Sequence, residues 1–125
     1  MHKTIPFALL LLIGCGSGEP EIHSCDYRPS QRVSESSCTD YEQITGSLDA
    51  LAAACKSIGA AWSDRPCDHK GALGGCRHKA SYYDDNRVRV TEVEWWWQGN
   101  LYKSYGAAKV DCTDSFDHTG QWVDP

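Results

Sequence analysis

Arg87–Trp97, RVRVTEVEWWW, is the clearest strand in the sequence and the best guide to its fold. Valine, threonine and tryptophan favour strands, and apolar residues alternate with polar ones along this run. The alternation is not uniform, because Val88 and Val90 have one parity whereas Val93, Trp95 and Trp97 have the other. A β-bulge near Thr91-Glu92 would reconcile the two halves, so we expect a long strand with a bulge there.

Two short helices are predicted elsewhere in the chain. LDALAAACKSI, residues 48–58, follows the good N-cap Ser47, ends at a glycine and repeats its apolar residues at helical spacing. Cys55 lies on the apolar face, where it can bond the helix to a strand. A second helix is expected after Ser104, with Cys112 on one face together with Tyr105 and Ala108.

The two predicted helices show a faint internal similarity, because each carries alanines and a cysteine and is followed by a glycine and a tryptophan. The residues concerned are Cys55, Gly59 and Trp62, and Cys112, Gly120 and Trp122, the last two in a polar tail. The match is too weak to predict a repeat, but it indicates two helices bridged to one sheet. Asp84-Asp85-Asn86 predicts a hairpin turn. We therefore expect a small α+β domain with an antiparallel sheet, two short helices and disulfides.

The N-terminal segment has the pattern of a secretion signal. A nine-residue apolar run, Ile5–Ile13, follows His2 and Lys3 and is too short to cross a bilayer. The stretch Leu12-Ile13-Gly14-Cys15 resembles the lipobox of bacterial lipoprotein precursors, with the expected residues at positions −3, −1 and +1. The alternative is an ordinary signal peptide whose Cys15 pairs elsewhere.

The lipobox resemblance implies a division of the chain and a location. Residues 1–14 would be a cleaved signal peptide, and Cys15 would carry diacylglycerol and an N-acyl chain, which together give stable membrane anchoring. Residues 15–24 would form a flexible tether, and residues 25–125 a cysteine-rich α+β domain. Gly16 after the cysteine implies an outer-membrane lipoprotein in some bacteria, facing the periplasm or the cell surface.

The remaining cysteines are even in number, and a secreted chain passes through an oxidising compartment, so we expect three disulfides. Fifteen pairings are possible, and the sequence does not choose among them. The cysteines are Cys25, Cys38, Cys55, Cys67, Cys76 and Cys112.

The domain also resembles small cysteine-rich bacterial lipoproteins of unassigned function. The matching segments are Cys38-Thr39-Asp40-Tyr41, a helical A-x-x-C, Gly74-Gly75-Cys76 and Trp95-Trp96-Trp97. This resemblance implies no activity and no cofactor other than the lipid on Cys15.

Length and charge exclude several classes of function. The chain has 125 residues, too few for a doubly wound nucleotide-binding sheet with a substrate domain. Its formal net charge is −5, which argues against a nucleic-acid partner.

Two clusters have residue types that can support chemistry. The motif C-x-H-x6-C-x-H, formed by Cys67, His69, Cys76 and His78, has the ligand types of a structural zinc site. An oxidising compartment, however, favours disulfides and no metal.

Trp95 and Trp97 share a strand face with Val93 and are the expected core pair.

Glu92, Glu94 and Trp96 share the other strand face, where an exposed tryptophan beside carboxylates would suit a sugar or a cationic group. The alternative is that Trp96 packs under Tyr102, Lys103 or a helix. Glu92 and Glu94 also have a spacing compatible with a glycosidase pair, although paired acids on an exposed strand are commonly solubilising.

These observations predict a membrane-anchored, non-catalytic binding or envelope-associated module, with no catalytic residues. Its expected partners are the membrane, through the lipid, and a glycan or an envelope protein. The alternatives are a small glycan-active or hydrolytic enzyme using Glu92 and Glu94, and a secreted, inhibitor-like disulfide protein.

Overall fold

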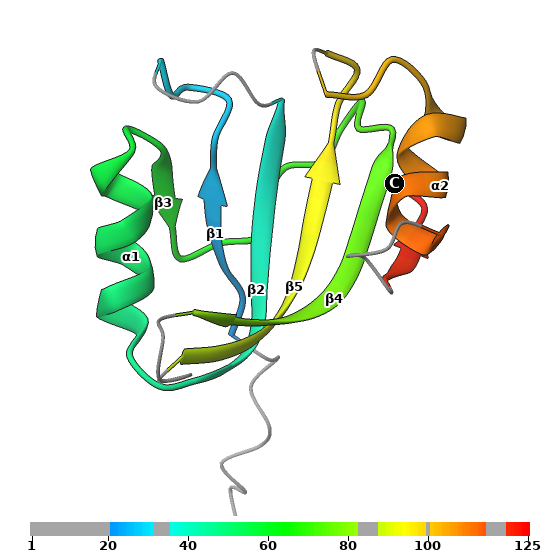
Figure 1. Cartoon of the computed structure of the whole chain (residues 1–125). Coiled ribbons are helices and arrows are strands. Elements are labelled where there is room, and N and C mark those ends of the chain that lie inside the picture. Colours follow the sequence, from blue (N-terminus) through cyan, green and yellow to red (C-terminus); the bar gives the residue numbers. More distant parts are fainter. Residues whose placement is uncertain (1–20, 32–35, 83–87, 100, 115–119) are drawn as a thin grey trace, which may run out of the picture.

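The computed structural model describes residues 21–31, 36–82, 88–99, 101–114 and 120–125. Within these residues the chain forms a six-stranded antiparallel sheet and two α-helices, which confirms the predicted α+β class (Figure 1). The strand order is β3-β1-β2-β5-β4-β6. The elements are β1 (His23–Asp26), β2 (Ser37–Thr45), α1 (Leu48–Ser57), β3 (Ala61–Ser63), β4 (Gly74–Tyr82), β5 (Val88–Trp96), α2 (Tyr105–Asp114) and β6 (Gln121–Val123).

Some predictions fall outside the described residues, including the lipobox with Cys15 and the turn at Asp84-Asp85-Asn86. The sheet itself begins at His23, two residues before the domain boundary expected from the sequence. Among the described residues, no helix is long and apolar enough to cross a membrane.

The predicted long strand is β5, which lies at the centre of the sheet between β2 and β4. Its register with β4 is unbroken along its length, so the bulge expected near Thr91-Glu92 is wrong. The irregularity lies instead in β2, between Glu42 and Thr45, where Gln43 has a φ of +46°. The extra residue is therefore in the strand opposite to the one that was expected to carry it.

β5 needs no bulge because different parts of its two faces are covered. Val88 and Val90 pack with Leu51 of α1 on one face. Val93 and Trp95 pack on the opposite face, in the cluster that contains Cys67. The change of parity in the sequence thus reflects two cores, one on each side of the same regular strand.

The fold consists of two similar ββαβ units. One contains β1, β2, α1 and β3, the other β4, β5, α2 and β6, and the strand order places them symmetrically about the β2–β5 contact. In each unit the first strand carries a cysteine that bonds to the helix, through Cys25–Cys55 and Cys76–Cys112. Figure 1 shows the two helices at opposite edges of the sheet.

The two helices begin and end alike. Both have ten residues, and a serine caps each one: Ser47 Oγ accepts the Ala50 N–H at 3.1 Å, and Ser104 Oγ accepts the Ala107 N–H at 3.2 Å. The bonded cysteine follows its cap by eight residues in both units. The similarity that was too weak in the sequence is therefore a repeat at the level of structure.

Each helix leads into a three-residue edge strand with a tryptophan at its centre. Trp62 of β3 lies opposite Cys25, and Trp122 of β6 lies opposite Cys76. The expected polar tail at Gly120–Trp122 is therefore wrong, because residues 121–123 pair with β4. Pairing through Trp122 also covers the outer edge of β4.

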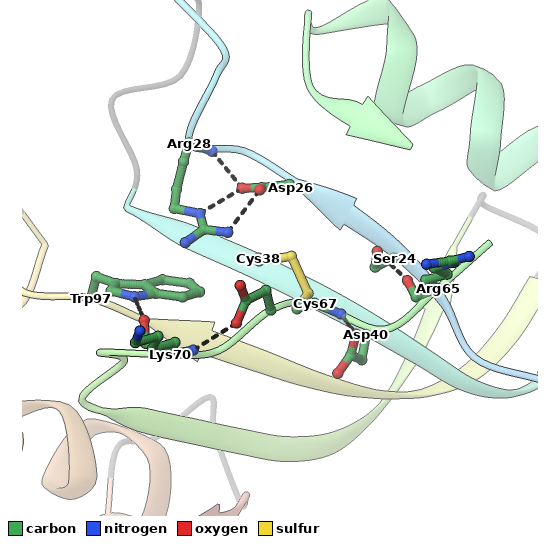
Figure 2. A network of polar contacts seen from close by, with 10 residues as sticks. Ser24, Asp26, Arg28, Cys38, Asp40, Arg65, Cys67, Lys70 and Trp97 are labelled. Carbon is green, nitrogen blue, oxygen red and sulfur yellow. Dashed lines mark hydrogen bonds and ion pairs between the residues drawn. A yellow bond between two sulfur atoms is a disulfide. The ribbon is translucent and has the colours of Figure 1, made fainter. Parts of the chain in front are cut away.

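The third disulfide bonds Cys38 of β2 to Cys67 in the connection between the two units, residues 64–73. With it, all three expected disulfides are present. Figure 2 shows this segment lying along the sheet, where the buried Asp40 carboxylate accepts the Cys67 N–H at 2.6 Å and Trp95 Nε1–H at 2.9 Å. Burial raises the pKa of Asp40, while the two hydrogen bonds oppose that rise. The connection thus covers the face of the sheet opposite the helices.

Candidate functional site

The face of the sheet to which α1 and α2 are bonded, here called the helix face, carries the candidate site. Residues directly opposite one another in antiparallel strands project to the same side, so a row of paired residues identifies a face. One such row crosses all six strands and contains the two helix-bonded cysteines. Its members are Trp62, Cys25, Thr39, Glu94, Cys76 and Trp122.

The neighbouring row on the helix face brings a histidine to the two predicted glutamates. Tyr41, Glu92 and His78 lie side by side on β2, β5 and β4. The Nε2 atom of His78 is 3.3 Å from Glu92 Oε1 and 3.4 Å from Glu94 Oε1. One potential ligand atom from each of the three residues lies within 4.8 Å of the others. The structure therefore unites Glu92 and Glu94, as expected, and adds His78.

Glu92 is almost fully buried, with 3% of its surface exposed, so the expectation of two solubilising carboxylates on an open strand is wrong for this residue. The Tyr82 hydroxyl donates a 2.5 Å hydrogen bond to Glu92 Oε2. Burial raises the pKa of Glu92 to about 7, and the charge of Glu94 acts in the same direction, whereas Tyr82 and His78 oppose the rise. Glu92 can therefore hold or release a proton near neutral pH.

His78 lies between the two carboxylates. Its pKa is raised, chiefly by the hydrogen bond to Glu94 and by the charges of both glutamates, while burial opposes the rise. Among the described residues, neither Glu92 nor Glu94 forms an ion pair with a lysine or an arginine. The imidazole is thus the basic group that faces these two acids.

A cavity of about 340 Å³ lies next to this cluster, between α1 and the end of the β4–β5 hairpin. Tyr27, Tyr41 and Tyr82 line it together with Leu51 and Ile58. Burial raises the pKa of Tyr41 and Tyr82 above the usual range, which keeps their hydroxyls protonated. Tyr82 links the cavity wall to Glu92.

Trp96 is not available to a ligand, because only 2% of its surface is exposed. The centroid of its ring lies 4.6 Å from that of Tyr102 and 6.3 Å from that of Trp122. The structure therefore supports the alternative in which this tryptophan belongs to the core. Trp95 is buried as expected, whereas Trp97 is only partly buried. Three consecutive tryptophans are accommodated because helix α2 covers the face on which Trp96 lies.

The zinc alternative built on Cys67, His69, Cys76 and His78 is wrong. Both cysteines form disulfides, and they lie on opposite faces of the sheet. The His69 ring stacks on Trp95 with a centroid separation of 4.0 Å, on the face away from the helices. Of the four residues, only His78 contributes to the cluster on the helix face.

The sequence interpretation missed the contributions of His78 and Tyr82 to the glutamate site. Both residues have the same parity on β4 and therefore point to the helix face with Cys76. Comparisons with known proteins found no match, whether to a family model, a curated protein or a solved structure.

Proposed function

We propose that the protein is a lipid-anchored, non-catalytic binding module of the bacterial cell envelope. The observation that carries this proposal is the use of the cysteines. Of the seven in the chain, the six described ones pair within the domain, which leaves Cys15 for a lipid. Cys15 also directly follows Gly14 at the end of an apolar run, the arrangement that acylated cysteines have in lipoprotein precursors.

The length of chain between Cys15 and the sheet would keep the domain close to a membrane. β1 begins at His23, eight residues after Cys15, and eight residues span at most about 29 Å. Two or more acyl chains on Cys15 would make the attachment effectively permanent. An anchored domain of this kind meets partners in the envelope, either glycans or envelope proteins.

The helix face favours binding over hydrolysis. Glu92 has the raised pKa of a general acid, but its carboxylate is buried and contacts Tyr82 and His78. Trp96, which would have stacked on a sugar, belongs to the core. The tyrosine-lined cavity and the partly exposed Glu94 are the features that a ligand can reach.

The intact mass of protein extracted from membranes tests the proposal. We expect acyl chains on Cys15 and six cysteines that react with an alkylating reagent only after reduction. Cys15→Ala should remove both the lipid and the membrane association, whereas the control Ser17→Ala should retain them. An unlipidated chain in the soluble fraction would overturn the anchor and favour a secreted protein. Glycan turnover that disappears in Glu94→Gln would overturn the non-catalytic assignment.

A further inference from the structure

We propose that His78, Glu92 and Glu94 bind a divalent metal ion, with Zn²⁺ as the ion that fits best. The proposal names a ligand for the binding function above and in that sense rests on it. The geometry that supports it involves the sheet alone and not Cys15. The site combines one imidazole with two carboxylates on neighbouring strands.

The two separations between His78 and the carboxylates match those around a tetrahedral ion. Nitrogen and oxygen ligands lie 2.0–2.1 Å from zinc, so two ligands of a tetrahedron are about 3.3–3.4 Å apart. His78 Nε2 lies 3.3 Å from Glu92 Oε1 and 3.4 Å from Glu94 Oε1. Direct ion pairs between such groups are usually closer, at about 2.7–2.9 Å. The observed spacing therefore leaves room for an ion between the imidazole and the two carboxylates.

The surrounding residues hold the ligands in place. The continuous β4–β5 register fixes His78 opposite Glu92 and next to Glu94 along the strands. The Tyr82 hydroxyl donates a hydrogen bond to Glu92 Oε2, and the other carboxylate oxygen, Oε1, faces His78. A hydrogen bond to the second atom of a metal ligand is the usual means by which proteins orient that ligand.

The internal repeat provides an independent indication that this cluster is not required by the fold. The register that places His78, Glu92 and Glu94 in the second unit places Tyr27, Ser37 and Thr39 in the first. These equivalent residues are all uncharged. The same ββαβ unit is therefore built without acids or a histidine at these positions, and their presence in one unit alone indicates a binding role.

Charge and access also suit a divalent ion. Two carboxylates face one imidazole, and a divalent cation would neutralise them where the described lysines and arginines do not. An imidazole with carboxylates favours zinc over calcium or magnesium, which prefer oxygen ligands alone. The side chains of Glu94 and His78 are 30% and 18% exposed, so solvent can supply a fourth ligand.

Metal binding to the purified, chelator-treated chain tests the proposal, with calorimetry and native mass spectrometry as readouts. We expect one Zn²⁺ per chain, and Co²⁺ in its place should give the intense visible absorption of a tetrahedral site. His78→Gln and Glu94→Gln should each weaken Zn²⁺ binding at least about tenfold, and Tyr82→Phe about tenfold. Glu42→Gln is the matched control, because Glu42 pairs with Arg77 and lies outside the cluster.

The outcomes separate this site from the lipid anchor. Zn²⁺ binding that is equal in wild-type and Cys15→Ala chains supports the site whether or not Cys15 is acylated. Folding of each variant is checked by circular dichroism and by its disulfides. The site is overturned if the folded chain binds no Zn²⁺, binds only Ca²⁺ or Mg²⁺, or binds Zn²⁺ unchanged after His78→Gln and Glu94→Gln.

Discussion

Thr39 of β2 lies directly opposite Glu94 of β5, and the two residues occupy equivalent positions in the two ββαβ units. The centre of the sheet is thus also the centre of the internal repeat. The strand order is symmetric about this pair, but the charge is not, because one side has a threonine and the other a glutamate next to His78. The candidate site lies where the sequence departs from the symmetry of the fold.

The symmetric disulfides lead to the first prediction. Peptide mapping under non-reducing conditions should give Cys25–Cys55 and Cys76–Cys112, together with the pair that holds the connection between the units. Replacing both cysteines of either helix-bonding pair with alanine should lower the free energy of unfolding by about 2–5 kcal/mol, measured by urea denaturation. The two losses should be similar, because the bonds are equivalent. Any other set of cross-linked peptides would contradict the fold.

Gly120 gives a second prediction, because it lies against the disulfide of the second unit. A Cβ at this position would lie 2.2 Å from Cys76 Sγ and 2.9 Å from Cys112 Sγ. Gly120→Ala should therefore lower the free energy of unfolding by about 1–3 kcal/mol. Gly106→Ala is the matched control, since a Cβ there meets nothing within 4 Å and alanine favours the helix by up to about 1 kcal/mol. Equal urea midpoints for the two variants would contradict this packing.

Asp40 gives a third prediction, because each of its carboxylate oxygens accepts one hydrogen bond. Cys67 N–H and Trp95 Nε1–H are both donors, so an amide at this position would direct its NH₂ group at one of them. Asp40→Asn should lower the free energy of unfolding by about 1–3 kcal/mol. The exposed Asp114 is the control, and Asp114→Asn should change stability by less than about 0.5 kcal/mol. A neutral effect of Asp40→Asn would show that these bonds contribute little.

Local patterns in the sequence predicted the elements well. The helix expected at residues 48–58 is α1, Leu48–Ser57, and the expected strand is β5. The repeat escaped prediction because its units share few residues beyond the helix caps, cysteines and tryptophans. Equal spacing from Ser47 to Cys55 and from Ser104 to Cys112 was the strongest available indication.

One pairing in the candidate site follows from a local pattern, whereas its burial depends on residues distant in sequence. A hairpin centred on Asp85, as the predicted turn implies, would already place His78 opposite Glu92. The burial of Glu92 was harder to foresee, because it requires Tyr41 from β2, a strand distant in sequence, and coverage of the sheet by α1. Similarly, Trp96 is buried only because α2 returns to the sheet through Cys112.

The raised pKa values at the site predict that the metal-free chain loses stability as pH increases. The pKa of Glu92 is about 7 in the fold, against an ordinary value of 4.5, so the folded state binds this proton more tightly than the unfolded state. The resulting stabilisation is complete below pH 4.5 and is lost as pH rises through about 7. The raised pKa of His78 likewise makes the folded state lose stability as pH increases. Tyr41, Tyr82 and Glu94 are the other titratable groups that face Glu92.

Urea denaturation with a chelator present, at pH 5 and at pH 8, measures this effect. The wild-type free energy of unfolding should be lower at pH 8 by an amount on the order of 3 kcal/mol, which corresponds to the displacement of the Glu92 pKa. Glu92→Gln keeps an acceptor for the Tyr82 hydroxyl and should remove most of this dependence. Glu42→Gln should show the wild-type dependence, since Glu42 belongs to a different ion pair. Stability that rises between pH 5 and pH 8 in the wild type, but not in Glu92→Gln, would mean that Glu92 is ionised and stabilised by its neighbours.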